Sequence, residues 1–321
     1  MAAPIIGFHA NHEQQRPDDL LRHVREAEAA GFDAAMCSDH WAPWSEAQGQ
    51  SGFAWSWLGA ALEATSLPFG VVNAPGQRYH PAIVAQAAAT LSVMYPGRFW
   101  LALGSGELMN EHITGEPWPR KADRNARLRE CADIIRLLWA GEVVTHEGHV
   151  TVSEARLWTR PEEPPLLVGA AISPESAAFV AEWADALITV AQPDEELHRV
   201  VDAFRSNGGS GKPMFLQVHL ASAPTDQEAR AAAFEQWRQN AQGPTVLADL
   251  AHPSQMVAAA SHVRPEDMDA VVRISSDPGR HAEWLRRDIE RGFERLYLHE
   301  VGREQERFIE SFGRDVLPQL R

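Results

Sequence analysis

The chain has little cysteine and no long apolar run. Its 321 residues include two cysteines, Cys37 and Cys131, too few for a disulfide framework and without metal-ligand spacing. No apolar segment approaches the ~20 residues that a membrane-spanning helix needs. Basic residues are also scarce, because 29 Lys and Arg stand against 44 Asp and Glu, for a net charge of −15. We therefore expect no metal site, no nucleic-acid partner and no membrane partner.

The N-terminus lacks the basic and apolar regions of a signal peptide. It reads Met-Ala-Ala-Pro-Ile-Ile-Gly and runs directly into an expected strand, so we expect a cytoplasmic protein. Hydrophobic residues make up 45% of the chain and charged residues 23%, as in soluble globular proteins. The length fits one (β/α)8 barrel or two smaller domains.

Short apolar segments alternate with helix-like segments along the chain. We expect eight strands, at residues 5–9, 32–37, 68–73, 98–103, 165–169, 186–190, 212–223 and 295–299. Eight strands that alternate with helices are typical of a parallel (β/α)8, or TIM, barrel. We expect one domain over residues 1–321, with insertions near 38–52, 143–158 and 225–268: a loop, a hairpin and a mostly helical segment.

The most informative stretch is 36–44, Met-Cys-Ser-Asp-His-Trp-Ala-Pro-Trp. Asp39 and His40 follow the second expected strand, at the strand end where βα proteins place their chemistry. His40 is a candidate proton acceptor near neutral pH, and Trp41 and Trp44 supply apolar walls beside it. The alternative is a structural histidine that caps the next element, with the tryptophans as packing.

Polar or small residues follow four other expected strands. They are His9, Asn11, His12 and Glu13; Asn73 and Pro75; Gly104-Ser105-Gly106-Glu107 with Asn110 and Glu111; and Gly169-Ala170-Ala171-Ile172-Ser173. In a barrel all of them would meet at one mouth. Taken alone, Glu13 can simply begin a helix and Gly104–Gly106 can be a tight turn without a ligand. Small-residue turns let backbone N–H groups approach a ligand, and a helix that begins at Ser173-Pro174 would suit a phosphate.

Several of these stretches resemble one family. They are Asn11-His12-Glu13-Gln14, Ser38-Asp39-His40 with Pro43-Trp44, Arg78-Tyr79-His80-Pro81, and Gly104-Ser105-Gly106-Glu107 with Asn110-Glu111. The chain resembles the luciferase-like flavin and deazaflavin oxidoreductases over almost its full length, apart from the helical insertion. It is most similar to the branch of F420-dependent glucose-6-phosphate and alcohol dehydrogenases. The resemblance implies a (β/α)8 barrel, the deazaflavin coenzyme F420 or, in a sub-branch, FMN, and a homodimer.

The resemblance also implies roles for particular side chains. His40 would take the hydroxyl proton as an alcohol carbon loses hydride, and Trp44 would line the substrate cavity. Glu107 would protonate the reduced deazaflavin ring. Glu13 would be a second acid in the pocket, and Asp39 would touch the cofactor ring.

The remaining expected site residues would hold the cofactor. Val71-Val72 falls where the family has a non-prolyl cis peptide bond behind the ring. The others are Gly104, Ser105, Gly106, Asn110, Ala170, Ala171, Ile172 and Val190. Residues 170–172 fall on the phosphate-binding turn, although the glycine pair of the family is absent there.

The sequence departs from the sugar-phosphate enzymes in its basic residues. The loop at 190–193 reads Val-Ala-Gln-Pro, without lysine, and the last strand offers Glu294 and Arg295 rather than a clear phosphate clamp. Because an unpaired phosphate is costly to bury, we expect a neutral alcohol, carbonyl or enone as substrate. Five aromatic side chains suggest an apolar lining, although the last two can equally be core residues: Trp41, Trp44, Phe53, Trp55 and Trp57.

We therefore expect an oxidoreductase in which F420 exchanges hydride with a small organic substrate, while the protein supplies orientation and proton transfer. One alternative is an FMN-dependent oxidoreductase or monooxygenase of the same fold. The other is a non-catalytic flavin-binding protein. His40 with Glu107 favours dehydrogenase chemistry, because both can manage protons beside a hydride transfer. Binding alone would need neither of them, nor Glu13.

Overall fold

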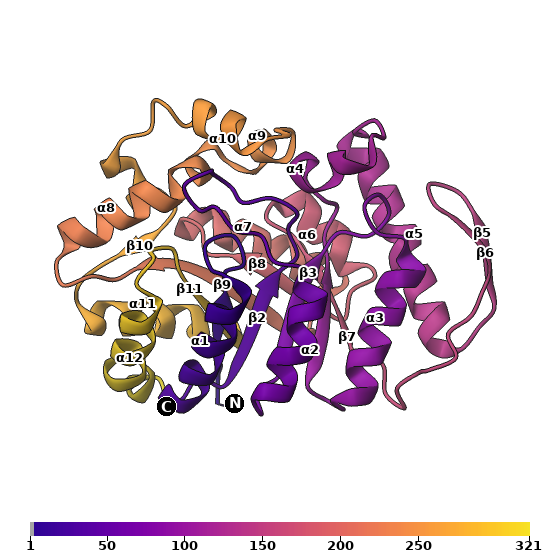
Figure 1. Ribbon diagram of the computed structural model, residues 1–321, viewed down its shortest axis with the longest axis horizontal. Helices are drawn as coiled ribbons and strands as arrows, with labels where there is room; N and C mark the ends of the chain where they lie inside the picture. The colour runs from indigo at the N-terminus through magenta and orange to yellow at the C-terminus, as the bar shows by residue number, and fades with distance from the viewer. Residues whose placement is uncertain (1–2) are drawn as a thin grey trace.

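Eight parallel strands form a closed barrel in the computed structural model, which describes residues 3–321 (Figure 1). The strands are β1 (Ile5–Ala10), β2 (Ala34–Ser38), β3 (Phe69–Asn73), β4 (Phe99–Leu103), β7 (Leu166–Ala170), β8 (Ala186–Val190), β9 (Met214–Ala221) and β11 (Arg295–Glu300). The ring closes because β1 pairs with β11 and β9 pairs with both β8 and β11. The predicted TIM barrel is confirmed, and each predicted strand bound lies within two residues of the observed one.

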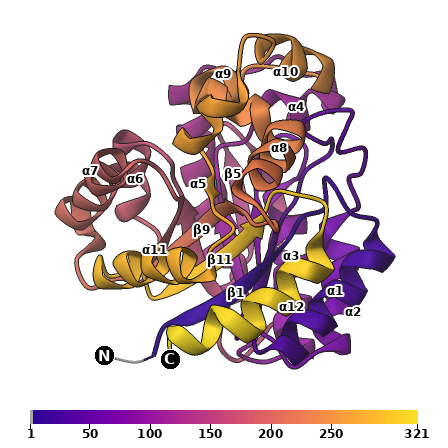
Figure 2. The same ribbon diagram turned by 90° about the vertical axis from the view of Figure 1, so that its left-hand side faces the viewer.

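Helices surround the barrel (Figures 1 and 2). They are α1 (Pro17–Ala30), α2 (Ala54–Ala64), α3 (Pro81–Met94), α5 (Lys121–Ala140), α6 (Pro174–Ala181), α7 (Asp194–Phe204), α11 (Pro278–Glu290) and α12 (Gln305–Asp315). The sequence of α1 explains where this helix begins and ends. Proline stands at its first position, Asp18 and Asp19 lie in its first turn, and Gly31 ends it with a φ of 96°. Its buried Leu20 and Val24 face the strands. Helix α11 was not predicted.

Tight packing fills the barrel interior. Its residues are Ala34, Met36, Trp100, Ala102, Val168, Ala186, Ile188, Phe215 and Tyr297. Nε1 of Trp100 donates a hydrogen bond to the Tyr297 hydroxyl at 3.0 Å. A Cβ on Gly70 would lie 1.8 Å from the Trp100 ring, so only glycine leaves room for the indole. Because the interior is filled, a ligand can enter only at the carboxyl ends of the strands.

Three segments depart from the strand–helix alternation. The hairpin β5 (Val144–Glu147) and β6 (Thr151–Ala155) stands at the outer side beside α5, and the loop 39–53 follows β2 (Figure 1). A helical segment covers the mouth, with α8 (Asp226–Trp237), α9 (Pro244–Ala248) and α10 (Pro253–Ala259) (Figure 2). That all residues form one domain, with these segments as insertions, stays a prediction.

Short elements complete the chain. They are α4 (Leu108–Glu111), the 3-10 helices η1 (His112–Thr114), η3 (Arg238–Gln242), η4 (Pro265–Ala270) and η5 (Leu317–Gln319), the π-helical turn η2 (Arg205–Gly209), and β10 (Arg273–Ile274), which pairs with β9. Trp118 Nε1 donates to Asp249 at 2.8 Å and so ties the loop before α5 to the helical segment above the mouth.

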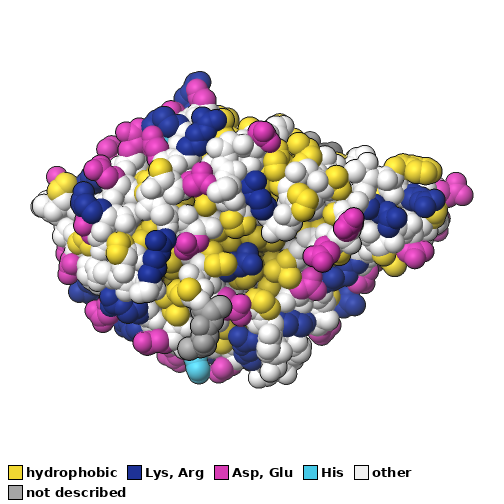
Figure 3. Space-filling model, turned by 90° about the horizontal axis from the view of Figure 1, so that it is seen from below, with side chains coloured by type: hydrophobic (Ala, Val, Ile, Leu, Met, Phe, Trp, Pro, Cys, Tyr) yellow, Lys and Arg dark blue, Asp and Glu magenta, His cyan; other side chains and the backbone are white. Residues whose placement is uncertain are grey.

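The face opposite the mouth carries acidic and basic side chains intermixed with hydrophobic ones (Figure 3). The excess of negative charge is therefore not gathered on this face. Among residues 3–321, no helix combines the length and the apolar character needed to cross a bilayer.

Candidate active site

A cavity of about 1130 Å³ opens at the carboxyl ends of the strands, and every predicted site residue except Val71 lines it. Val72 faces the cavity, whereas Val71 is packed in the hydrophobic layer behind the strand, because successive strand residues point to opposite faces. The implied cis bond between the two is also wrong, since every peptide bond within residues 3–321 is trans.

His40, which follows β2, is held by Glu13 from the loop after β1. Its Nδ1 bonds Oε1 of Glu13, and its Nε2 lies 4.0 Å from Oε2 of Glu107. Trp44 packs edge-on against the imidazole, with 5.3 Å between ring centroids and 89° between planes. Ser51 donates to the His40 carbonyl at 2.8 Å. One imidazole nitrogen is thus engaged by Glu13, and the other is turned toward Glu107 at longer than hydrogen-bond distance.

The two carboxylates differ in their electrostatic environment. Burial acts to lower the pKa of His40, but the negative charges of Glu13 and Glu107 outweigh it and raise that pKa above its usual value. Burial acts to raise the pKa of Glu13, but the bond with His40 and its charge lower it instead. Burial dominates at Glu107 and raises its pKa. Glu13 is therefore the residue that holds negative charge, and Glu107 is the one more readily protonated.

A second polar network surrounds Asp39. Its Oδ2 accepts a hydrogen bond from Asn73 Nδ2 at 2.8 Å and lies 3.5 Å from Nη2 of Arg78. Arg78 also donates to the Asp39 carbonyl at 2.6 Å, and its backbone N–H donates to Glu111 at 2.7 Å. Asp39 Oδ1 and Asn73 Oδ1 are buried with no hydrogen-bond partner in the described chain. Such unpaired acceptors beside a cavity suit the N–H donors of a ligand.

The turn after β4 brings the backbone close to the cavity. Gly106 has a φ of 81°, and a Cβ there would meet Glu111 at 3.3 Å and Ala74 at 3.4 Å, so the turn favours glycine. Ser105 Oγ accepts a hydrogen bond from Lys121 Nζ at 2.7 Å. The turn therefore combines close backbone approach with a positive charge.

Asn110 links this turn to the His40 loop. Its Oδ1 accepts from the backbone N–H of Trp41 at 2.8 Å, and its Nδ2 donates to Glu107 Oε2 at 3.3 Å. Asn110 thus positions Glu107 relative to the segment that carries His40.

The expected phosphate-binding turn leads into α6. Ala170, Ala171 and Ile172 line the cavity. Ser173 caps the helix by accepting from the Ser176 N–H at 3.3 Å. Glu175 lies in the first turn, where backbone N–H bonding lowers its pKa. The N-terminus of α6 therefore already has two hydrogen-bond acceptors, Ser173 and Glu175, and a phosphate would have to compete with them.

The cavity fits a flat ring on one side. That side is lined by small or branched apolar residues and glycines: Val72, Ala74, Gly104, Gly106, Ala170 and Val190. The unpaired oxygen of Asn73 lies at the end of β3, and that of Asp39 lies just beyond the neighbouring strand β2. A flavin or deazaflavin, with its flat face and ring N–H group, matches this combination.

The other side of the cavity was missed by the sequence analysis. Gln217 and His219 of β9, His299 of β11 and Trp237 of α8 line it. A signal was available, because polar residues alternate with apolar ones toward the end of β9, which indicates side chains that point into the barrel.

Two of the five expected wall aromatics lie at the surface and two in the core. Trp41 and Phe53 are 56% and 54% exposed. Trp57 belongs to the main core, and Trp55 packs against it. Of the five, only Trp44 lines the cavity, where Trp118 and Trp237 join it.

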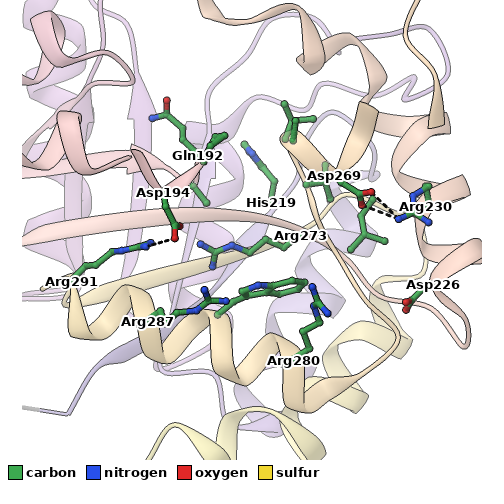
Figure 4. A pocket seen from close by; sticks show the side chains of 17 residues that line it. Gln192, Asp194, His219, Asp226, Arg230, Asp269, Arg273, Arg280, Arg287 and Arg291 are labelled. Carbon is green, nitrogen blue, oxygen red and sulfur yellow. Dashed lines mark hydrogen bonds and ion pairs between the residues drawn. The ribbon is translucent and has the colours of Figure 1, made fainter. Parts of the chain in front are cut away.

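A second cavity, of about 540 Å³, adjoins the first and shares Gln192 and His219 with it (Figure 4). Five arginines line it: Arg230, Arg273, Arg280, Arg287 and Arg291. No local sequence pattern marks this cluster, because its arginines are spread between positions 230 and 291. Arg291 pairs with Asp194 at 2.8 Å and Arg230 with Asp269 at 2.9 Å. Arg273 bonds the buried Asp288.

One group of possible metal ligands lies outside both cavities. His23, Glu26 and Glu306 each offer one atom within 4.8 Å of the others. Arg22 already bonds Glu306 and lies 3.3 Å from Glu26, so a guanidinium balances these carboxylates.

The chain matches proteins of one family over its length. The model of the family described as luciferase-like monooxygenase matches residues 3–295. An F420-dependent glucose-6-phosphate dehydrogenase of Microbacterium testaceum is 34% identical, with 100% of this chain and 99% of the relative aligned. One of Beutenbergia cavernae is 34% identical, with 98% and 97% aligned.

A solved structure shows the same architecture. An F420-dependent secondary alcohol dehydrogenase, in complex with an F420-acetone adduct, superposes with a TM-score of 0.91 at 30% identity and covers 99% of each chain. The resemblance read from the sequence motifs is thus confirmed. By its match to the family model over residues 3–295 and to these relatives over almost its whole length, the chain belongs to the luciferase-like monooxygenase family.

Proposed function

We propose that the protein is an F420-dependent oxidoreductase that transfers hydride between the deazaflavin and a neutral alcohol or carbonyl compound. The observation that carries the proposal is the pairing of His40 with Glu13 inside the cavity, with the second imidazole nitrogen turned toward Glu107. The F420-dependent relatives support the choice of cofactor over FMN.

Residues of the chain itself would accept the proton of the substrate hydroxyl. A bound deazaflavin supplies the hydride acceptor or donor. Neutral His40 would accept the hydroxyl proton at Nε2, because its Nδ1 is bonded to Glu13. The Glu13 carboxylate fixes the tautomer with the proton on Nδ1 and stabilises the imidazolium that forms. Trp44 keeps the imidazole in place and excludes water from one side.

The cofactor side would be served by other residues. Glu107, whose pKa is raised by burial, would hold a proton near the ring. Asp39 and Asn73 would accept ring N–H groups with their unpaired oxygens. Small residues at the ends of β3, β4, β7 and β8 would let the ring lie flat.

Part of the positive charge of the second cavity is already balanced, which supports a neutral substrate. Three of its five arginines, Arg291, Arg230 and Arg273, each have an ion-pair partner. A substrate phosphate that bound these three would have to replace those carboxylates. A sugar phosphate is nevertheless the second candidate, because arginines border the cavity and the aligned relatives are glucose-6-phosphate dehydrogenases.

A cytoplasmic location and a homodimer belong to the same proposal. The homodimer rests on the family resemblance, and the location is an expectation from the sequence. Light scattering during size-exclusion chromatography would measure the mass in solution and so test the dimer. A mass of one 35.5 kDa chain would contradict it.

Parallel titrations of the apoprotein with F420 and FMN test the proposal, followed by turnover assays with a panel of neutral alcohols and carbonyls. We expect F420 to bind more tightly and to be reduced by at least one alcohol. Submicromolar FMN binding without F420 binding would favour the FMN-dependent alternative. Tight F420 binding without turnover of any compound, sugar phosphates included, would favour the non-catalytic one.

A further inference from the structure

The two sides of the main cavity differ in chemistry. The side formed by β3, β4, β7 and β8 presents mainly small and apolar groups, whereas β1, β9 and β11 present His9, Gln217, His219 and His299. The proposed proton transfer uses none of these four side chains. Such a concentration of neutral hydrogen-bonding groups inside a barrel is costly unless the groups find partners.

Three of the four side chains are held in one chain of contacts. His299 Nε2 lies 2.7 Å from Asn11 Nδ2. The Gln217 amide lies 3.2 Å from His299 Nδ1 and 3.2 Å from His219 Nε2. Trp237 packs against both imidazoles, with its ring centroid 4.8 Å from that of His299 and 5.0 Å from that of His219. These contacts fix the orientation of His219 and His299.

His9 is the exception. Its ring stacks on His299 with 4.3 Å between centroids and 14° between planes. The residue is 2% exposed and lines the cavity. Neither of its ring nitrogens has a hydrogen-bond partner within residues 3–321. The stacking holds the ring in place, and both ring nitrogens are buried without a protein partner.

The histidine side is uncharged near neutral pH. Burial lowers the pKa of His9 to about 4 and that of His219 to about 3, and it lowers the pKa of His299 as well. A neutral imidazole offers one N–H donor and one acceptor nitrogen. This pair matches a hydroxyl or carbonyl oxygen and does not neutralise a phosphate or carboxylate.

We propose that His9 is a specificity-determining residue that binds a second oxygen function of the substrate. The preferred substrates are then neutral compounds that carry a hydroxyl or carbonyl group in addition to the one that reacts at His40. This inference rests on the proposed function, because it places the reacting group at His40.

Matched pairs of alcohols test the inference. Each pair consists of a monohydroxy alcohol and the diol of the same carbon skeleton, with 1,2-, 1,3- and 1,4-spacings. We expect the wild-type enzyme to show a higher kcat/KM for at least one diol than for its partner. His9→Phe keeps the flat ring that stacks on His299 but removes both nitrogens. It should lower the diol-to-monool ratio of kcat/KM about 3- to 10-fold, as expected for one hydrogen bond.

Two further variants separate recognition from folding. His9→Gln restores a donor and an acceptor and should recover part of the ratio. His12→Asn is a matched control, because His12 is equally buried on the same segment but does not line the cavity, so the ratio should stay at the wild-type value. Equal losses for both members of every pair in His9→Phe, or a wild-type enzyme without any diol preference, would overturn the inference.

Binding measurements keep this test separate from the proposed function. Trp44 and Trp237 line the cavity, so their fluorescence can report diol and monool binding without any cofactor. If F420 fails to bind, the proposed function fails, while the Kd ratio of diol to monool in wild type and His9→Phe still decides the role of His9. If monohydroxy alcohols are oxidised with F420 but neither ratio changes in His9→Phe, only this inference fails.

Discussion

Glu13 and His40 stand at equivalent distances beyond two paired strands, and their side chains bond each other. Ala10 of β1 pairs with Cys37 of β2 in the parallel register, and each functional residue follows three positions later. Strand pairing therefore brings together a carboxylate and an imidazole that are 27 positions apart in the chain. This register is the reason that one imidazole nitrogen is occupied and the other is available for chemistry.

Replacing His40 with asparagine should lower kcat for alcohol oxidation by ~10²–10⁴-fold, the usual contribution of a positioned proton-transfer group. F420 affinity should change little, because the proposed ring contacts come from Asp39, Asn73 and the strand ends. Single-turnover rates, cofactor titration and melting temperature should be measured on one preparation. A lower melting temperature with an unchanged single-turnover rate would show that His40 is structural.

Glu13→Gln should move the pH dependence of oxidation to lower pH. Oxidation needs neutral His40, so kcat/KM should rise with pH and level off above the pKa of His40, which lies above its ordinary 6.5 in the wild type. Removing the Glu13 charge leaves burial to lower that pKa. The rising limb should therefore appear at lower pH, with a reduced plateau because the imidazolium loses its partner.

Glu175→Gln is the matched control for this pH profile. Glu175 also lines the cavity but belongs to α6 and does not pair with His40. The rising limb of the kcat/KM profile of Glu175→Gln should stay at the same pH as in the wild type. If the rising limb of the kcat/KM profile lies at the same pH in Glu13→Gln as in the wild type, Glu13 does not set the protonation of His40.

Glucose 6-phosphate should be a poor substrate compared with neutral alcohols in the same panel. Asp194→Asn should improve its KM by roughly 1.5- to 5-fold, because an exposed ion pair of this kind is weak and its removal leaves Arg291 with Asp288 as its remaining partner. Asp202→Asn on the same helix is the control, since Asp202 pairs with His198 outside the cavity. A wild-type kcat/KM for the sugar phosphate above that of every neutral compound would instead favour the second candidate function.

Glu300 should make folding stability depend on pH. Burial raises its pKa to about 7 from 4.5, so between these values the folded protein holds a proton that the unfolded chain has released. Stability should therefore fall by about 3 kcal/mol as pH rises through this window, and it should level off above it. The free energy of unfolding of Glu300→Gln, measured in urea, should rise relative to that of the wild type as the pH increases from 4.5 to 7. A constant difference between the two proteins would contradict this, and exposed Glu294→Gln serves as the control.

Local patterns were sufficient to predict the barrel and most of its mouth. Apolar runs bounded by turns and helices indicated each strand, and polar residues at strand ends indicated His40, Glu107 and Glu13. These features depend on residues near one another in the chain. The family motifs added the roles, and all but Val71 of the expected site residues line the cavity.

The tertiary structure alone decided which side chains meet. It turned Val72 into the cavity and Val71 into the core. It also decided between the two roles expected for Trp55 and Trp57, because Trp57 lies in the core and Trp55 packs against it. It also gathered arginines from positions 230 to 291 around one cavity and brought His9 against His299. Composition and periodicity report on neighbours along the chain. Strand register and barrel closure set the distances between residues hundreds of positions apart, and the chemistry of the site depends on those distances.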